Sequence, residues 1–160
     1  MISRSAVHAI RALSALSTLP PGVRVGTATL AKKIDAPPNY LGKLLQTLAR
    51  HGLVDSRKGL GGGFSLARMP GEIRLLDVVQ PMEQVDRFEG CFLGRAECSD
   101  ADPCALHDRW ADLRDRYLAI LSETTLADLL ETGRDAVDLT GRPEDARSAG
   151  RASTGNPKPV

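Results

Sequence analysis

The segment that most constrains how this chain can fold spans residues 37–68, PPNYLGKLLQTLARHGLVDSRKGLGGGFSLAR. Its leucines recur at helical spacing up to Gly52, which predicts an amphipathic helix over residues 38–51. Two short apolar runs then flank a basic, glycine-rich turn, and this pattern predicts a β-hairpin with Arg57 and Lys58 at its tip. A helix followed by a hairpin with a basic tip is typical of a winged helix.

Two further helices are predicted before this segment. Residues 2–18 place apolar side chains on one helical face, and the prolines that follow end that helix. A shorter helix is predicted to begin with Thr27 as its N-cap and to end near Ala36. The helix over residues 38–51 would then be the second helix of a helix-turn-helix. The expected fold class is therefore mainly α with a small β-hairpin wing. The polar residues turned outward on this second helix are Asn39, Lys43, Gln46 and Arg50.

The chain after the hairpin is expected to be helical again. The stretch GEIRLLDVVQPMEQV predicts a short helix closed by Pro81, and the stretch from Cys104 to Glu131 predicts a long one. Apolar residues of the long helix alternate at spacings of four and three, as in the seam of a coiled coil. This helix either pairs with a second copy of the chain or lies on its own core. The seam residues are Leu106, Trp110, Leu113, Tyr117 and Ile120.

The net charge of +1 conceals an uneven distribution of charge along the chain. Residues 1–70 carry ten Lys/Arg against two Asp/Glu, whereas residues 71–139 carry seven against sixteen. A basic N-terminal half that coincides with a helix-turn-helix favours binding to a phosphate backbone. The glycine run opens no helix and lacks the Lys-Ser/Thr ending of a P-loop, and no catalytic constellation stands out. We therefore expect a DNA-binding protein that is not an enzyme.

The N-terminal stretch indicates where the protein works. Serines and arginines interrupt its apolar stripe, so it is neither a convincing signal peptide nor a membrane span. A cytoplasmic protein with no membrane association is expected, and thiols stay reduced in that compartment. Clustered cysteines there indicate metal binding or redox sensing more than a disulfide framework.

All three cysteines lie in one short polar stretch, CFLGRAECSDADPCALH. Six residues separate Cys91 from Cys98 and five separate Cys98 from Cys104, unlike the CxxC pairs of structural zinc sites. Soft thiolate ligands suit iron–sulfur clusters and zinc alike. His107 lies one helical turn beyond Cys104. It is either a fourth ligand or an exposed histidine at the start of a helix.

The order of these parts resembles the IscR/NsrR family of bacterial winged-helix transcription regulators, also called the Rrf-two family. The resemblance covers residues 1 to about 131 and rests on SRSAVHAIRAL, the helix and wing segment, IRLLDVVQPME and three cysteines before a long helix. It implies a homodimer that binds double-stranded DNA at a palindromic operator, most often as a repressor. It also implies an iron–sulfur cluster of two or four irons that senses nitric oxide, redox state or iron–sulfur status. The implied ligands are Cys91, Cys98, Cys104 and His107.

The resemblance implies a DNA-binding domain (1–82), a cluster-binding loop (83–104) and a dimerisation helix region (105–131). The loss of apolar periodicity from about Thr140 predicts a disordered tail (140–160). The alternative is the same DNA-binding regulator without iron, either stabilised by zinc or sensing by direct oxidation of cysteine. Contacts to DNA are expected from the helix-turn-helix and the wing. The residues expected to make them are Thr29, Asn39, Tyr40, Lys43, Gln46, Arg50, Arg57, Lys58 and Gly59.

Overall fold

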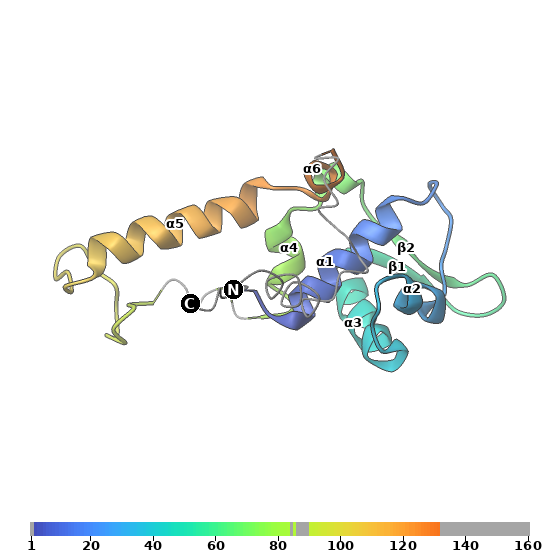
Figure 1. Cartoon of the computed structure of the whole chain (residues 1–160), viewed down its shortest axis with the longest axis horizontal. Coiled ribbons are helices and arrows are strands. Elements are labelled where there is room, and N and C mark those ends of the chain that lie inside the picture. Colours follow the sequence, from blue (N-terminus) through green and yellow to red (C-terminus); the bar gives the residue numbers. More distant parts are fainter. Residues whose placement is uncertain (1, 84, 86–89, 132–160) are drawn as a thin grey trace, which may run out of the picture.

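The computed structural model of the chain describes residues 2–83, 85 and 90–131 (Figure 1). The fold is mainly helical with one two-stranded antiparallel sheet, which confirms the fold class expected from the sequence. Residues 140–160, expected to be a disordered tail, lie outside the described residues. The elements in chain order are α1 (Arg4–Ser17), α2 (Thr27–Lys33), α3 (Pro38–Arg50), β1 (Val54–Arg57), β2 (Gly63–Leu66), the 3-10 helix η1 (Pro70–Glu72), α4 (Leu75–Val79), α5 (His107–Glu123) and α6 (Leu126–Glu131).

The helix α1 lies at the centre of the N-terminal body, in contact with α2, α3, α4 and α6. It begins where the side chain of Ser3 accepts a hydrogen bond from the N–H of Ala6 at 3.1 Å. Ala6, Ala9 and Leu13 are fully buried, so the predicted apolar stripe does face the core. Because alanine is small, the neighbouring helices can pack close to α1.

The predicted helix-turn-helix is formed by α2 and α3. The leucines of α3 are buried, and Gly52 follows this helix with a left-handed φ of 68°, as its predicted place at the helix end requires. Two details of α2 were predicted wrongly. Gly26, not Thr27, is the N-cap, and Thr27 is the first helical residue. The helix also ends at Lys33 rather than near Ala36, because Asp35 adopts a φ of 50° that turns the chain towards α3.

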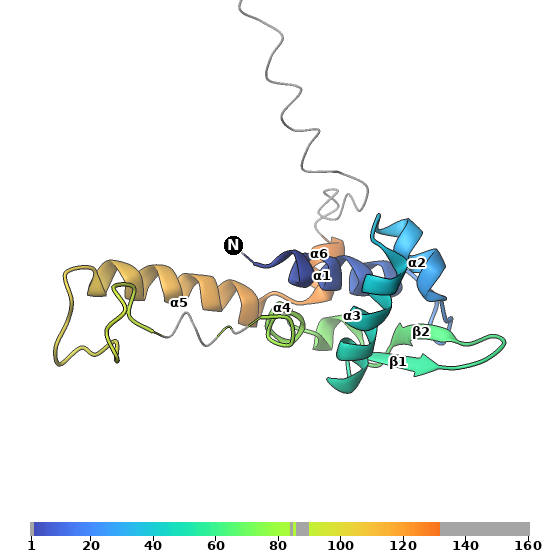
Figure 2. The ribbon, with the colours of Figure 1, turned by 90° about the horizontal axis from the view of Figure 1, so that it is seen from below.

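The hairpin of β1 and β2 follows α3 and projects from the body (Figure 2). Residues 54–57 pair with residues 63–66, and β2 is also bridged to the segment before α2. In that bridge Val25 and Phe64 exchange two backbone hydrogen bonds, each 2.9 Å long. The strands that support the hairpin tip are therefore attached to the segment before α2.

Glycine is required at two places in the hairpin turn. A Cβ added to Gly62 would lie 2.3 Å from the carbonyl oxygen of Arg57, and one added to Gly63 would lie 2.6 Å from that of Val25. Gly63 also has a φ of 134°, which other residues rarely adopt. The glycine run is therefore explained by the closeness of the backbone at the turn.

The predicted continuous helix at the C-terminal end is wrong, since the chain divides it into α5 and α6. Thr124 is extended between them, and its carbonyl accepts a hydrogen bond from the N–H of Leu75 at 2.9 Å. The Thr125 hydroxyl accepts from the N–H of Asp128 at 3.2 Å, and the Asp128 carboxylate accepts from the N–H of Thr125 at 2.7 Å. This reciprocal pair starts a new helix at the break.

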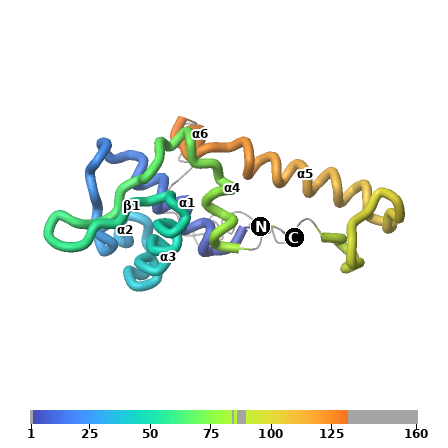
Figure 3. Tube along the Cα trace, turned by 180° about the vertical axis from the view of Figure 1, so that it is seen from behind, coloured from blue at the N-terminus to red at the C-terminus, as the bar shows by residue number. Residues whose placement is uncertain are grey.

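The helix α5 extends away from the N-terminal body as an arm (Figures 1 and 3). Its buried residues are His107 at one end and Leu121 at the other, where α5 contacts α4. The predicted short helix after the hairpin is present as α4, which ends before Pro81. Within the described ranges no helix is long and apolar enough to cross a membrane.

Candidate nucleic-acid interface and cysteine loop

The outer face of α3 and the tip of the hairpin present exposed polar and basic side chains. Successive turns of α3 expose Lys43, Gln46 and Arg50, and Arg50 Nη2 donates to Thr47 Oγ1 at 3.0 Å. Such residues can contact phosphates and the edges of bases in a groove. The exposed residues among those expected to contact DNA are Thr29, Asn39, Lys43, Gln46, Arg50, Arg57, Lys58 and Gly59.

Tyr40 is placed differently from the other expected contacts. It is half-buried, and its hydroxyl donates to Ser5 Oγ at 3.0 Å. Its ring meets the ring of His8 edge-on, with the centroids 5.5 Å apart. Burial, followed by the charge of Arg11, lowers the pKa of His8. Tyr40 therefore joins the start of α3 to α1 through a packed contact.

The wing tip exposes an apolar side chain that sequence reasoning missed. Leu60 is fully exposed, and it lies between Gly59 and Gly61, whose φ angles are 90° and 72°. The signal in the sequence is that Leu60 is the one side chain in a run of glycines.

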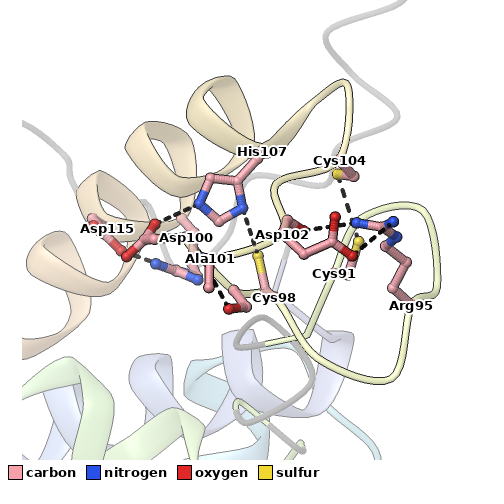
Figure 4. A network of polar contacts seen from close by, with 11 residues as sticks. Cys91, Arg95, Cys98, Asp100, Ala101, Asp102, Cys104, His107 and Asp115 are labelled. Carbon is pink, nitrogen blue, oxygen red and sulfur yellow. Dashed lines mark hydrogen bonds and ion pairs between the residues drawn. The ribbon is translucent and has the colours of Figure 1, made fainter.

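The four residues expected to hold a cofactor lie at the far end of the arm, where they form two pairs (Figure 4). The Sγ atoms of Cys91 and Cys104 are 3.7 Å apart. Cys98 Sγ lies 3.5 Å from Nδ1 of His107. The three thiols are free and half-buried. Which cysteine lies beside which could not be predicted from the sequence.

His107 is not the exposed histidine that was the alternative expectation. It is 8% exposed, and its Nε2 lies 2.7 Å from Oδ1 of Asp100. An ionised carboxylate can only accept, so Nε2 carries the proton and the lone pair of Nδ1 faces Cys98. Sequence reasoning missed this contact of Asp100, because one acidic residue in a polar loop shows no pattern.

Contacts within the loop and to the start of α5 define the shape of the loop. Arg95 donates to the carbonyl oxygen of Asp102 at 2.8 Å and forms an ion pair with its carboxylate at 3.1 Å. Trp110 Nε1 donates to the carbonyl of Gly90 at 2.8 Å. The backbone N–H of Arg95 is the largest influence on Cys91 and lowers the pKa of its thiol, against the opposing effect of burial. The loop thus has defined contacts although it contains no helix or strand.

The pair distances can be compared with those in a metal site. Two thiolates on one tetrahedral metal with bonds of about 2.3 Å lie about 3.8 Å apart, and a thiolate lies about 3.6 Å from an imidazole nitrogen on the same metal. The Cys91–Cys104 and Cys98–His107 distances of 3.7 and 3.5 Å are close to these values. Across the described part of the chain, no three Cys, His, Asp or Glu side chains gather around one position. The four donors therefore lie as two pairs, each at the spacing of two ligands on one metal, and not around one position.

The loop and the wing lie at opposite ends of the molecule (Figure 3). The arm formed by α5 separates them, and α5 reaches the N-terminal body at α4. Within the described residues, α5 joins the loop to the N-terminal body.

Comparison with known proteins places these features in a family context. The Rrf2 family model, described as an iron-dependent transcriptional regulator, matches residues 2–132. The HTH-type transcriptional regulator IscR of Salmonella paratyphi B is 32% identical over 131 residues, which is 80% of this chain and 79% of that protein.

Solved structures show the same fold. The structure of T. potens IscR matches with a TM-score of 0.67 at 22% identity, covering 91% of this chain and 96% of that chain. The structure of CymR, the global cysteine regulator of B. subtilis, matches with a TM-score of 0.68 at 23% identity, covering 82% of this chain and 97% of that chain. The relatives are regulators of transcription, in agreement with the expectation that this chain is not an enzyme.

Proposed function

Because the chain belongs to the Rrf2 family of winged-helix transcriptional regulators, we propose that it acts as a homodimer whose binding to a palindromic operator is switched by an iron–sulfur cluster. Repression is the expected direction of control. A regulator of this kind works where the DNA is, in the bacterial cytoplasm.

The DNA-binding part is supported by the exposed face of α3 and by the wing. The proposed direct readers are Asn39, Lys43 and Gln46, since Asn and Gln can bind adenine with two hydrogen bonds and Lys can reach guanine. Arg57 and Lys58 at the wing would contact phosphate or the minor groove. Thr29, Arg50 and Gly59 would add backbone contacts, and Tyr40 would act by holding α3 against α1.

The dimer is supported by the exposure of α5. Leu113 and Ile120 are each 60% exposed, although they are large and apolar and lie two turns apart on one face. A second copy of this chain is the proposed cover, because a palindromic operator requires two symmetric winged helices. The half-exposed Leu106, Trp110 and Tyr117 extend the same stripe along the arm.

The cluster is supported above all by the two ligand pairs. Cys91 with Cys104 would hold one iron, and Cys98 with His107 would hold the other, which favours the two-iron form. When bound, the cluster supplies a group that nitric oxide, oxidants or iron limitation can alter. The residues of the chain hold these donors in place: Asp100 orients His107, and Arg95 closes the loop on Asp102.

The zinc-stabilised alternative is less well supported by this arrangement. A structural zinc ion takes four ligands around one position, whereas these four donors form two separate pairs. Sensing by direct oxidation of cysteine requires no set of metal ligands. It requires thiols that are free and accessible, and the three thiols here are free and half-exposed.

The proposal is tested by selecting operators from a random DNA library with protein purified without oxygen. We expect a palindrome whose half-sites lie about one helical turn apart, or a multiple of it. Removing the cluster with a chelator should change the affinity for that sequence about tenfold or more. Failure to recover any preferred sequence would contradict the DNA-binding part. An affinity unchanged by chelation would contradict the switch.

A further inference from the structure

We propose that Cys91 and Cys104 form a disulfide within one chain when the loop carries no metal and meets peroxide, and that Cys98 stays outside this bond. The loop would then have a second, covalent state in addition to the metal-bound one. The bond itself does not depend on the proposed function, but its effect on DNA binding rests on it.

The positions of the two thiols carry the proposal. Cys104 follows Cys91 by thirteen positions in the sequence, yet their Sγ atoms are 3.7 Å apart. A disulfide has an S–S distance of about 2.05 Å, so the sulfurs must approach by less than 2 Å. Both residues lie in a stretch without helix or strand before His107, where side-chain rotations and a small backbone shift can supply that movement. Both are half-exposed, so a small oxidant can reach them.

Cys98 is held away from this pair. Its Sγ lies against Nδ1 of His107, and that ring is fixed from its other side by Asp100. His107 belongs to the rigid first turn of α5 and is almost fully buried. Figure 4 shows the Cys98–His107 pair and the Cys91–Cys104 pair as separate groups. For Cys98 to join a disulfide, it would have to leave the imidazole.

The chemistry balances with hydrogen peroxide as the oxidant. One thiolate attacks the O–O bond, which gives a sulfenic acid and, after proton transfer, one water. The second thiol attacks the sulfenic sulfur, the S–S bond forms, and a second water leaves. Overall, two thiols are oxidised, one peroxide is reduced, and two waters are released.

This bond would affect the loop in two ways. It occupies one of the two ligand pairs, so a disulfide and a complete cluster exclude each other. It also ties Cys91 to Cys104, the residue three positions before α5, which closes a covalent ring next to the arm. A chain that lost its cluster under oxidising conditions would thus stay metal-free until it is reduced.

The test maps the disulfide in the full-length chain after a chelator has removed metal without oxygen. The protein is treated with a small excess of hydrogen peroxide, free thiols are alkylated, and the sample is digested with trypsin and an Asp-specific protease. Trypsin cuts after Arg95, and cleavage before Asp100 and Asp102 separates Cys98 from Cys104. Mass spectrometry then identifies the linked peptides.

We expect one linked pair that contains Cys91 and Cys104, with Cys98 recovered as the alkylated thiol. Cys98→Ser should form the same bond to a similar extent, whereas Cys91→Ser and Cys104→Ser should not form it. Recovery of Cys98 in the main disulfide, a bond between two chains on a non-reducing gel, or oxidation to sulfinic acid without a bond would each overturn the proposal. DNA binding does not enter this measurement, so its result is separate from the operator selection.

Discussion

His107 Nε2 donates to the Asp100 carboxylate at 2.7 Å, so that the opposite ring nitrogen presents its lone pair to Cys98. Histidines that bind metals commonly donate their second N–H to a carboxylate in this way. Such a partner fixes the tautomer and the orientation of the ring, and it makes the imidazole a stronger ligand. The contact therefore places Asp100 in the site although it would not touch a metal.

Replacing Asp100 should weaken the hold on the cluster without removing a ligand. Asp100→Ala frees the ring of His107, and loss of such a partner typically lowers metal affinity by about 10- to 100-fold. The rate of iron loss to a chelator, followed by absorbance, measures this. Asp108→Asn, an exposed carboxylate in the first turn of α5, is the matched control and should leave that rate unchanged.

The two kinds of DNA contact should respond differently to substitution. Lys58→Ala should weaken binding to all sequences and reduce the slope of log affinity against log salt by about 1. Gln46→Ala should instead cost about 1–3 kcal/mol at one base pair and relax the preference there. Binding titrations at several salt concentrations separate these effects. An identical response to both substitutions would contradict the division, and Arg116→Ala on α5 should change neither.

The wing should tolerate alanine at one glycine and not at another. Gly61 has a φ of 72° with open space around it, so Gly61→Ala should cost about 1 kcal/mol. Gly63→Ala adds a clash with the Val25 carbonyl and should cost more than about 2 kcal/mol. Denaturant unfolding of both variants checks the order. Equal free energies of unfolding would show that the bridge between Val25 and Phe64 does not constrain the hairpin.

The exposed stripe on α5 should be needed for dimerisation. Leu113→Arg places a charge in the proposed seam and should shift the protein to monomer in analytical ultracentrifugation. Asp115→Asn changes the charge in the same direction on a face about 200° away around the helix, and it should leave the dimer intact. A dimer that survives Leu113→Arg would mean that the two chains meet elsewhere.

The burial of His8 should make the stability of the protein depend on pH. Burial and the Arg11 charge lower the pKa of His8, with a smaller lowering from Arg4, opposed by a hydrogen bond to the Arg4 backbone and by Asp35. Since the folded pKa lies below the unfolded value of about 6.5, the stabilising contribution is present above pH 6.5 and is lost as the pH falls through the folded pKa.

We therefore expect His8→Phe to lose less unfolding free energy than the unchanged chain between pH 7.5 and pH 5. Denaturant unfolding at each pH provides the comparison. The difference between the two pH profiles matters here, because the substitution also changes the packing against Tyr40. Parallel profiles would contradict the lowered pKa.

The sequence predicted those parts of the fold that periodicity and turn residues determine. The leucines of α3 and Gly52 define a helix with one buried face, and the glycine run defines a hairpin. The break before α6 was missed, because the apolar spacing continues across it while the Thr125–Asp128 capping pair starts a new helix. The packing of Tyr40 onto α1 depends on residues distant in sequence, which no local pattern shows.

The candidate site was predictable in its composition but not in its arrangement. Cys91, Cys98, Cys104 and His107 were expected to act together, yet a loop without periodic structure does not fix which donors lie side by side. Asp100 had no signal of its own. These relationships arise from the way the loop folds onto the start of α5.

The proposed two-iron cluster, held by two pairs of donors, can be detected by the absorption spectrum, iron content and acid-labile sulfide content of the full chain purified without oxygen from iron-replete cells. We predict visible absorption from sulfur-to-iron charge transfer, with about two irons and two sulfides per chain. A colourless protein, or one that holds a single zinc ion per chain, would contradict the claim.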